Sequence, residues 1–171
     1  SNSAAVSVNV SGTTSATSFG INVEQLARGQ SVASSVMGAA GTPVGAGSMS
    51  IQLGTWSANG TAFAPGSEAA KNVAIEATDS LSDIASKING ANAGVTATVL
   101  RDASGERLLM RSSTTGEESG FRINVTEDAG ALGLSRLAFD PAAAPTVGMA
   151  ANATQYGQNA KATINGIEVQ S

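Results

Sequence analysis

The chain has 171 residues, of which 42% are hydrophobic but only 4% aromatic, so small aliphatic side chains must supply most of its core. It contains no histidine and no cysteine, which excludes Ser-His-Asp and Cys-His catalysis, disulfide bonds and cysteine-based zinc sites. The net charge of -4, without any cluster of Lys or Arg, argues against a nucleic-acid partner, and no run of about 18 apolar residues is present to span a membrane.

The N-terminal part of the chain predicts strands. Apolar and polar residues alternate with period two over Ala4–Val10, which is typical of a half-buried strand. The alternation resumes at Phe19 and continues through Met37, although the second half of this stretch allows either a strand or a short helix. The Gly-rich stretch Gly38–Gly47 then predicts a connector and a candidate boundary between two units.

Two further strands are expected after this connector, at Ser48–Trp56 and Asn72–Thr78. The residues between them predict a loop, in which Asn59-Gly60 is a strong turn signal. Trp56 allows two interpretations: it fills a small core, or it is exposed and forms a candidate partner contact.

An amphipathic helix is the clearest element of the sequence. Leu81, Ile84, Ala85 and Ile88 occupy positions i, i+3, i+4 and i+7, which places them on one helical face. A helix of about ten residues is too short to be stable alone in water, so this face must pack on a sheet.

Local signals predict where this helix begins and ends. Ser80 is suited to the N-cap, and Asp83 three residues later completes an arrangement like a capping box. At the other end, we expect Asn89-Gly90 to supply the left-handed residue that terminates the helix.

The remainder of the chain again predicts β-structure. The expected elements are strands at Gly94–Asp102 and Glu106–Ser113 forming a hairpin, a strand at Gly120–Glu127, a loose helical turn at 128–137, a connector at 140–158, and two short strands in Ala160–Gln170 about Asn165-Gly166. The expected fold class is therefore α+β and mostly β, with antiparallel sheets and one short helix packed on a sheet. Because the two ends of the chain look alike, we expect an inserted-domain layout: residues 1–39 and 150–171 form a discontinuous outer β-unit, and 40–149 form an inserted α+β unit.

Candidate chemical sites are few. We interpret Glu117-Glu118 and Glu127-Asp128 as solvated loop charges, and Asp102–Glu106 as a hairpin turn rather than a calcium loop. Gly45–Gly47 is interpreted as linker, because no Lys-Ser/Thr follows to complete a phosphate loop. We therefore expect no catalytic residue, no metal site and no cofactor, and we expect that the chain is not an enzyme.

Residues 79–116, DSLSDIASKINGANAGVTATVLRDASGERLLMRSSTTG, resemble the flagellin and hook IN motif. The residues that carry the resemblance are Leu81, Asp83, Ile84, Ala85, Ile88, Asn89, Gly94, Val95, Ala97, Val99, Gly105, Arg107, Leu108, Met110 and Ser112. The stretch INGIEV, which contains Asn165 and Gly166, is similar to a shorter second copy. FGINVEQLARGQSVAS is similar to the V-x-Q-L-A-x-x-Q stretch of the flagellar filament-cap (hook-associated protein 2, FliD) family.

This resemblance implies a structural and assembly role. Proteins of the family form a ring at the distal end of the bacterial filament, outside the cell, and assist the insertion of flagellin subunits. The implied partners are flagellin and further copies of the cap protein, and export is expected to proceed without a cleaved signal peptide. The resemblance also implies that the chain is a head part without the family's helical legs and with a truncated outer β-unit, so we expect it to be monomeric in isolation. The alternative is a secreted adhesin or carbohydrate-binding β-module.

Overall fold

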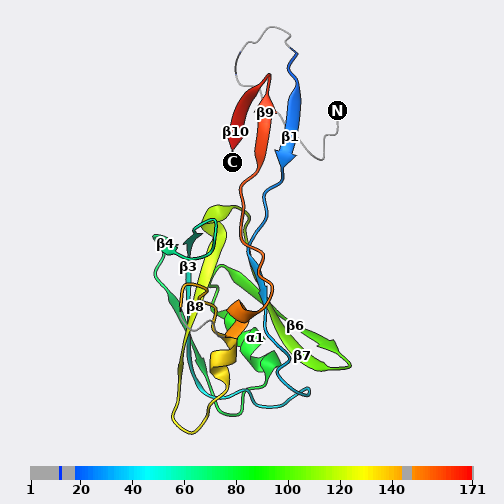
Figure 1. The fold of residues 1–171 in the computed structure, drawn as a ribbon. Helices are drawn as coiled ribbons and strands as arrows, with labels where there is room; N and C mark the ends of the chain where they lie inside the picture. The colour runs from blue at the N-terminus through cyan, green and yellow to red at the C-terminus, as the bar shows by residue number, and fades with distance from the viewer. Residues whose placement is uncertain (1–11, 13–17, 144–147, 171) are drawn as a thin grey trace.

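The computed structural model describes residue 12 and residues 18–143 and 148–170. These residues form three antiparallel sheets and one α-helix (Figure 1), which confirms the predicted fold class. The strand expected at Ala4–Val10 lies outside the described residues. Within the described part of the chain, no helix is long and apolar enough to cross a membrane.

The first sheet, here called the outer sheet, joins segments from opposite ends of the chain. Its order is β1 (Ile21–Gln25), β9 (Lys161–Ile164) and β10 (Ile167–Gln170). The turn between β9 and β10 has positive φ at Asn165 (48°) and Gly166 (84°), as the Asn-Gly pair predicts for a two-residue hairpin. Asn165 also holds β1, because its Oδ1 accepts a hydrogen bond from the Gly20 N–H at 2.9 Å.

Two extended segments, residues 26–30 and 155–160, connect the outer sheet to the rest of the molecule and are here called the neck (Figure 1). They run antiparallel, with reciprocal backbone hydrogen bonds between Arg28 and Gln158 (both 3.0 Å). Where the neck meets the body, Ser31 and Gln155 exchange a second pair of such bonds (2.8 and 2.9 Å). The part of Phe19–Met37 that allowed either strand or helix is thus extended.

The second sheet has four strands around β3 (Gly47–Trp56). One edge of β3 pairs along its length with β8 (Gly120–Glu127), and its other edge pairs first with β5 (Lys71–Ile75) and then with β4 (Phe63–Pro65). The register places Ile51 opposite Ile123 and Met49 opposite Val73. The alternating apolar residues of these strands therefore share one buried face.

The third sheet has the order β2 (Ser31–Ala33), β7 (Gly105–Ser112) and β6 (Val95–Asp102). β6 and β7 form a hairpin that projects from the body in Figure 1, with Val95 opposite Ser112 and Asp102 opposite Gly105. The helix α1 (Leu81–Gly90) contacts β5, β6 and β7. Three short 3-10 turns complete the body: η1 (Glu117–Ser119), η2 (Leu134–Leu137) and η3 (Gly148–Ala151).

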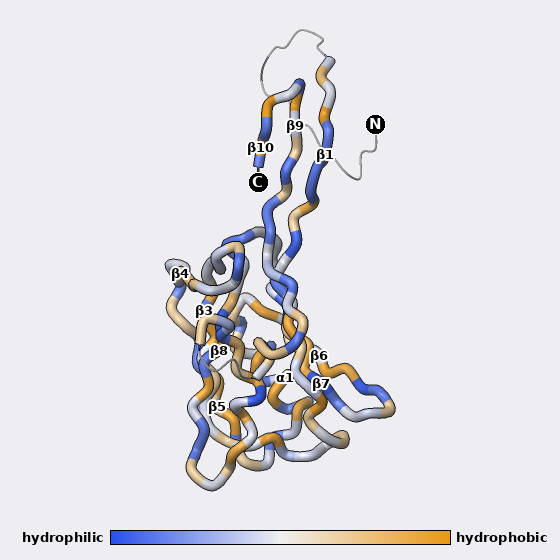
Figure 2. Tube along the Cα trace, viewed as in Figure 1, coloured by the Kyte–Doolittle hydropathy of each residue, from blue (hydrophilic) through white to orange (hydrophobic). Residues whose placement is uncertain are grey.

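One hydrophobic core joins the helix and the two body sheets. Its fully buried large side chains are Met49, Ile51, Leu81, Ile84, Ile88, Leu108, Met110, Phe121, Ile123, Leu134, Leu137 and Phe139. Figure 2 shows the apolar positions concentrated in the body. Burying each large aliphatic side chain contributes roughly 1.5–3 kcal/mol, so the low aromatic content does not prevent a stable core.

The helix ends differently from the sequence prediction. Asn89 and Gly90 are the last two residues of α1, and neither has positive φ. The left-handed residues are Asn92 (φ 49°) and Gly94 (φ 71°), in the turn that leads into β6. The expectation at Asn89-Gly90 was wrong because Asn89 makes a tertiary contact that holds it in the last helical turn.

The division of the chain into outer segments 1–39 and 150–171 around an inserted unit stays a prediction. β2 pairs with β7, and the N–H groups of Ser34 and Met37 donate to the carbonyls of Leu108 and Glu106 (both 2.8 Å). Because these residues join the body, we propose that the first boundary lies near the neck rather than at residue 39.

Candidate functional site

The IN-motif residues build a scaffold in which α1 lies on the β6–β7 hairpin. Leu81, Ile84 and Ile88 are at most 1% exposed and face the sheet. The hairpin supplies Val95 (5% exposed) and Leu108 (0%) to the same core. The helical spacing of three and four residues therefore produces one apolar face that the sheet covers completely.

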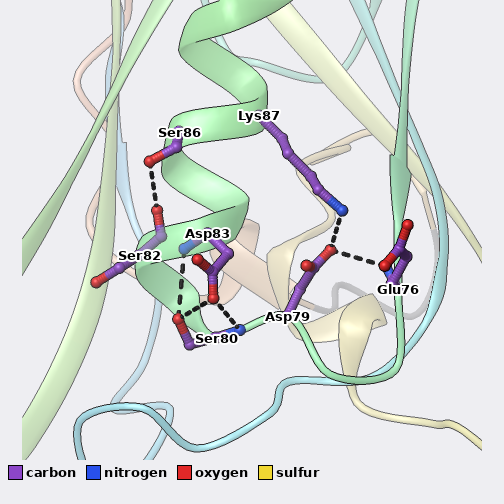
Figure 3. A network of polar contacts seen from close by, with 7 residues as sticks. All are labelled: Glu76, Asp79, Ser80, Ser82, Asp83, Ser86 and Lys87. Atoms are coloured by element: carbon purple, nitrogen blue, oxygen red, sulfur yellow. Dashed lines mark hydrogen bonds and ion pairs between the residues drawn. The ribbon is translucent and has the colours of Figure 1, made fainter.

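A full capping box begins the helix (Figure 3). The Asp83 N–H donates to Ser80 Oγ at 3.4 Å, and the Ser80 N–H donates to Asp83 Oδ2 at 3.0 Å. The Ser80 hydroxyl also donates to Asp83 Oδ2 at 2.6 Å. The hydrogen bonds from the Ser80 side chain and backbone hold the pKa of the Asp83 carboxyl below its ordinary value of 3.8.

An ion pair ties the end of β5 to the helix (Figure 3). Asp79 Oδ2 lies 2.5 Å from Lys87 Nζ and accepts a hydrogen bond from the Glu76 N–H at 2.8 Å. The hydrogen bond to Asp79 raises the pKa of the Lys87 ammonium above 10.5. Asp79 is only 7% exposed, so this carboxylate is a structural element rather than a free surface charge.

Asn89, the asparagine of the motif, joins the helix to the edge of the hairpin. Its Nδ2 donates to the Ala97 carbonyl at 2.9 Å, and its Oδ1 accepts from the Ala97 N–H at 2.8 Å. β6 is an edge strand, so these two backbone groups have no neighbouring strand. The asparagine amide replaces one residue of that missing strand, which gives a physical reason for asparagine at this position.

Gly94 lies where the turn after the helix approaches β3. Its φ is 71°, and a Cβ at this position would lie 2.6 Å from Leu53 Cδ1. Glycine is therefore favoured mainly by the backbone conformation, because the end of the flexible Leu53 side chain could shift to admit a Cβ.

Arg107 lies near the tip of the hairpin, outside the core. Its Nε lies 3.8 Å from Asp102 Oδ2. Asp102 in turn accepts a hydrogen bond from the Ser104 N–H at 2.7 Å, as expected for a hairpin turn. Ser104 lowers the pKa of the Asp102 carboxyl through its side-chain and backbone hydrogen bonds.

Two groups of the selected residues lie away from this scaffold. Asn165 and Gly166 form the turn of the outer sheet and do not join the helix and hairpin. Trp56 is 8% exposed, and its Nε1 donates to the Phe121 carbonyl at 3.0 Å. Its ring packs against Phe63 (4.8 Å between centroids) and Phe139 (5.8 Å), which favours the interpretation of Trp56 as a core residue over that of a partner contact.

Gln30 was part of the quoted V-x-Q-L-A-x-x-Q stretch, but the sequence did not indicate its role. It is completely buried, and its amide pairs with both backbone groups of Phe121 on β8, at 2.9 Å (Nε2 to O) and 3.0 Å (N to Oε1). Its own backbone bonds Ser112 of β7, so one residue joins the two body sheets. The one feature of the sequence that could have indicated this buried role is a glutamine within an alternating apolar stretch.

Glu127, at the end of β8, caps the backbone of the turn that follows it. Glu127 Oε1 accepts hydrogen bonds from the Ser135 N–H (2.8 Å) and the Gly133 N–H (2.7 Å), and these bonds lower the pKa of its carboxyl below 4.5. Among the described residues, no group of three or more acidic or histidine side chains could hold a metal ion. A cavity of about 340 Å³ beside the neck is lined by charges of both signs, including Arg28, Lys161 and Glu117.

Comparison with known proteins finds similarity to flagellar proteins. Residues 59–114 match the model of the flagellin hook IN motif, a range that covers β4, β5, α1, β6 and β7. Over 83 residues, the chain is 40% identical to the B-type flagellar hook-associated protein 2 of Pseudomonas aeruginosa. That match covers 46% of the chain and 18% of the relative, so the chain spans less than one fifth of this curated protein.

Solved structures of flagellar cap proteins share the fold. The D2-D3 domains of FliD from Escherichia coli superpose with a TM-score of 0.75 at 24% identity, covering 95% of this chain and 78% of that one. FliD (HAP2) from Pseudomonas aeruginosa PAO1 matches with a TM-score of 0.66 at 27% identity, covering 93% and 69% of the two chains. The chain is therefore similar in fold to flagellar cap proteins (FliD, hook-associated protein 2), and residues 59–114 match the flagellin hook IN motif.

Proposed function

We propose that the chain is the head part of a filament cap, which forms a ring at the tip of the bacterial flagellum and assists the insertion of flagellin. The work of such a part is contact between subunits, so it needs a rigid platform and exposed surface rather than reactive groups. The proposed location is outside the cell, and the proposed partners are flagellin and further copies of the cap protein.

The observation that carries this proposal is the interlocked helix and hairpin of the IN motif. Three of its polar side chains make contacts that hold the helix in place: Asp83 caps the helix, Asp79 pairs with Lys87, and Asn89 forms hydrogen bonds with Ala97. The segment that resembles flagellar proteins is thus also the segment that fixes the shape of the body. This favours a structural role over an enzymatic one.

The carbohydrate-binding alternative is not favoured by the positions of the aromatic residues. Sugar recognition by stacking needs exposed rings on one face, whereas Trp56, Phe121 and Phe139 are buried and Phe63 and Tyr156 pack against the core. Among the described residues, Phe19 is the one aromatic residue whose side chain is largely exposed, with 43% of its surface accessible to solvent.

Complementation tests the proposal. A bacterial strain that lacks its filament-cap gene should regain filaments when it receives the full-length gene that encodes this chain. The filaments are observed by electron microscopy. Immunoblotting of the culture medium controls for export of the protein. Export without filaments would contradict the proposal, and specific binding of the purified chain to a glycan array would support the adhesin alternative instead.

The oligomeric state of the isolated chain gives a second test. We expect a monomer by size-exclusion chromatography with light scattering, because ring formation is proposed for the filament cap protein and not for its head part alone. A stable ring formed by the isolated chain at high concentration would contradict this expectation.

A further inference from the structure

The chain contains three Asn-Gly pairs, at 59–60, 89–90 and 165–166. Asn-Gly is the sequence at which an asparagine side chain most readily loses ammonia, because glycine has no Cβ to hinder attack by its backbone nitrogen. Two of the pairs follow an isoleucine, in Ile88-Asn89-Gly90 and Ile164-Asn165-Gly166, and both of their asparagines are exposed. A difference in reactivity between these two sites must therefore come from the fold rather than from the local sequence or from access to solvent.

The reaction uses the glycine nitrogen as a nucleophile. This nitrogen gives up its proton and forms a bond to the asparagine Cγ, the bond between Cγ and Nδ2 breaks, and ammonia leaves with that proton. Water then opens the resulting succinimide ring at one of its two carbonyl carbons, which gives aspartate or isoaspartate. A glycine N–H that donates a hydrogen bond in the fold must first lose that bond, so the partner of each glycine N–H determines which pair reacts.

Two of the three glycine N–H groups already donate hydrogen bonds. Gly90 lies in the last turn of α1, where the helical pattern directs its N–H to the carbonyl four residues earlier. The amide of Asn89 is also held by both backbone groups of Ala97, at 2.9 and 2.8 Å. The N–H of Gly60, which is buried, donates to the Ser57 carbonyl at 2.8 Å. The fold therefore protects both of these pairs.

The third pair, Asn165-Gly166, has a different environment. It forms the turn between β9 and β10, at the end of the molecule away from the body (Figure 1). Both residues are exposed, and their φ angles of 48° and 84° place them in the left-handed region. Within the described part of the chain, the Gly166 N–H donates no hydrogen bond. The nucleophile of this pair therefore has no bond to lose before it reacts.

The fold also places a hydrogen-bond donor at the oxygen on which negative charge develops. Attack at Cγ transfers charge to Asn165 Oδ1, and this oxygen accepts a hydrogen bond from the Gly20 N–H at 2.9 Å. A backbone N–H in this position stabilises a tetrahedral intermediate, as the donors of an oxyanion hole do. We propose that Asn165 is a site of spontaneous deamidation in the folded chain, with the Gly166 nitrogen as the nucleophile and the Gly20 N–H as the donor to the oxyanion.

The modification acts on the joint between β1 and the hairpin. Isoaspartate adds one carbon to the main chain of the turn, and the amide oxygen that holds the Gly20 N–H becomes part of that main chain. The outer sheet pairs β1 with β9 directly beside this contact, at Ile21 opposite Ile164. The amide hydrogens of β1 should therefore exchange faster with solvent in the isoaspartate form than in the unmodified chain.

Peptide mapping by mass spectrometry tests the proposal on the full chain. The folded protein is incubated at mildly alkaline pH and digested with trypsin, and the deamidated fraction of each asparagine is followed over days. Trypsin cuts after Lys71, Lys87 and Lys161, so the three pairs fall on different peptides. Asn165 should react at least about tenfold faster than the other two asparagines, because their reaction requires local opening of the fold.

The same chain unfolded in guanidinium chloride provides the control. Asn89 and Asn165 should then react at nearly equal rates, because the sequence Ile-Asn-Gly is common to both. If Asn165 reacts no faster than Asn89 in the folded chain, or if Asn59 reacts fastest, the proposal is overturned. A reaction at Asn165 that occurs only in the unfolded chain would show that the turn protects this residue, which also overturns the proposal.

A pair of variants tests the role of the Gly20 N–H. Gly20→Pro removes this N–H, whereas Gly20→Ala keeps it, and no atom lies within 4 Å of a Cβ at this position. With native circular dichroism in both variants, Asn165 should react at least about threefold more slowly in Gly20→Pro than in Gly20→Ala. Equal rates would overturn the assignment of Gly20 as the donor to the oxyanion.

Discussion

The substitution Asn89→Ala tests whether the motif asparagine stabilises the scaffold through the edge of β6. It removes two hydrogen bonds to Ala97, of 2.9 and 2.8 Å, each with a net contribution of about 0.5–1.5 kcal/mol. Alanine favours the helix by about 0.6 kcal/mol over asparagine, which leaves a net loss of roughly 0.5–2.5 kcal/mol in the free energy of unfolding. Ala97 is only 4% exposed, so water reaches its freed groups poorly and the upper half of this range is expected.

Urea unfolding followed by fluorescence provides the assay, because Trp56 is the single tryptophan and is buried. A loss of about 2 kcal/mol lowers the midpoint by about 1 M urea for a slope of about 2 kcal/mol per molar. Ser86→Ala is the matched control: it lies on the exposed side of the same helix and gains a similar helix propensity. It should change the free energy of unfolding by no more than about 0.5 kcal/mol.

The variant Asn89→Asp sharpens the test. Aspartate keeps an acceptor for the Ala97 N–H but places a carboxylate oxygen against the Ala97 carbonyl, so it should be less stable than Asn89→Ala near pH 7. Protonation restores a donor, so part of the loss should return as the pH approaches about 4. If Asn89→Ala and Ser86→Ala had equal midpoints, the proposed edge contact would contribute nothing and the reasoning would be refuted.

Three further predictions concern the helix end, the sheet junction and the dependence on pH. Gly90→Ala should stabilise the fold by about 0.5–1 kcal/mol, because Gly90 is helical and a Cβ there has no atom within 4 Å. Gly94→Ala should destabilise the fold by more than about 1 kcal/mol, because Gly94 has a positive φ. Equal urea midpoints for the two variants would contradict the left-handed conformation of Gly94. Gln30→Ala leaves the Phe121 N–H unpaired in the core, whereas the Phe121 carbonyl keeps its hydrogen bond from Trp56 Nε1. The substitution should therefore cost about 1–3 kcal/mol by the same assay, and a loss below about 0.5 kcal/mol would show that water replaces the amide. Because the pKa of the Asp83 carboxyl is lowered in the folded state, its contribution to the free energy of unfolding is present above pH 3.8 and is lost as the pH falls below that value. The fall in urea midpoint on acidification should therefore be smaller in Asp83→Asn. An identical fall would exclude this carboxyl as a contributor to the pH dependence.

Much of the local structure could be predicted from the sequence, because short-range interactions determine it. The spacing of Leu81, Ile84 and Ile88 indicates a helix with one apolar face, and Ser80 with Asp83 indicates where it begins. Period-two alternation similarly predicts the strands of the body, since each alternate residue faces the core. The turn at 165–166 follows from the tolerance of Asn and Gly for positive φ.

Only the tertiary structure decided which distant segments meet. Nothing in the local pattern of Gln30 indicates a partner 91 residues away, and the pairing of β3 with β8 is equally non-local. Asn89 looked like a helix terminator because its neighbours in sequence favour a turn, but its amide bonds an edge strand that exists only after the hairpin has folded onto the helix. Backbone propensity depends on a few adjacent residues, whereas hydrogen bonds between elements depend on the packed arrangement of the whole core, and this is why the first could be predicted and the second could not.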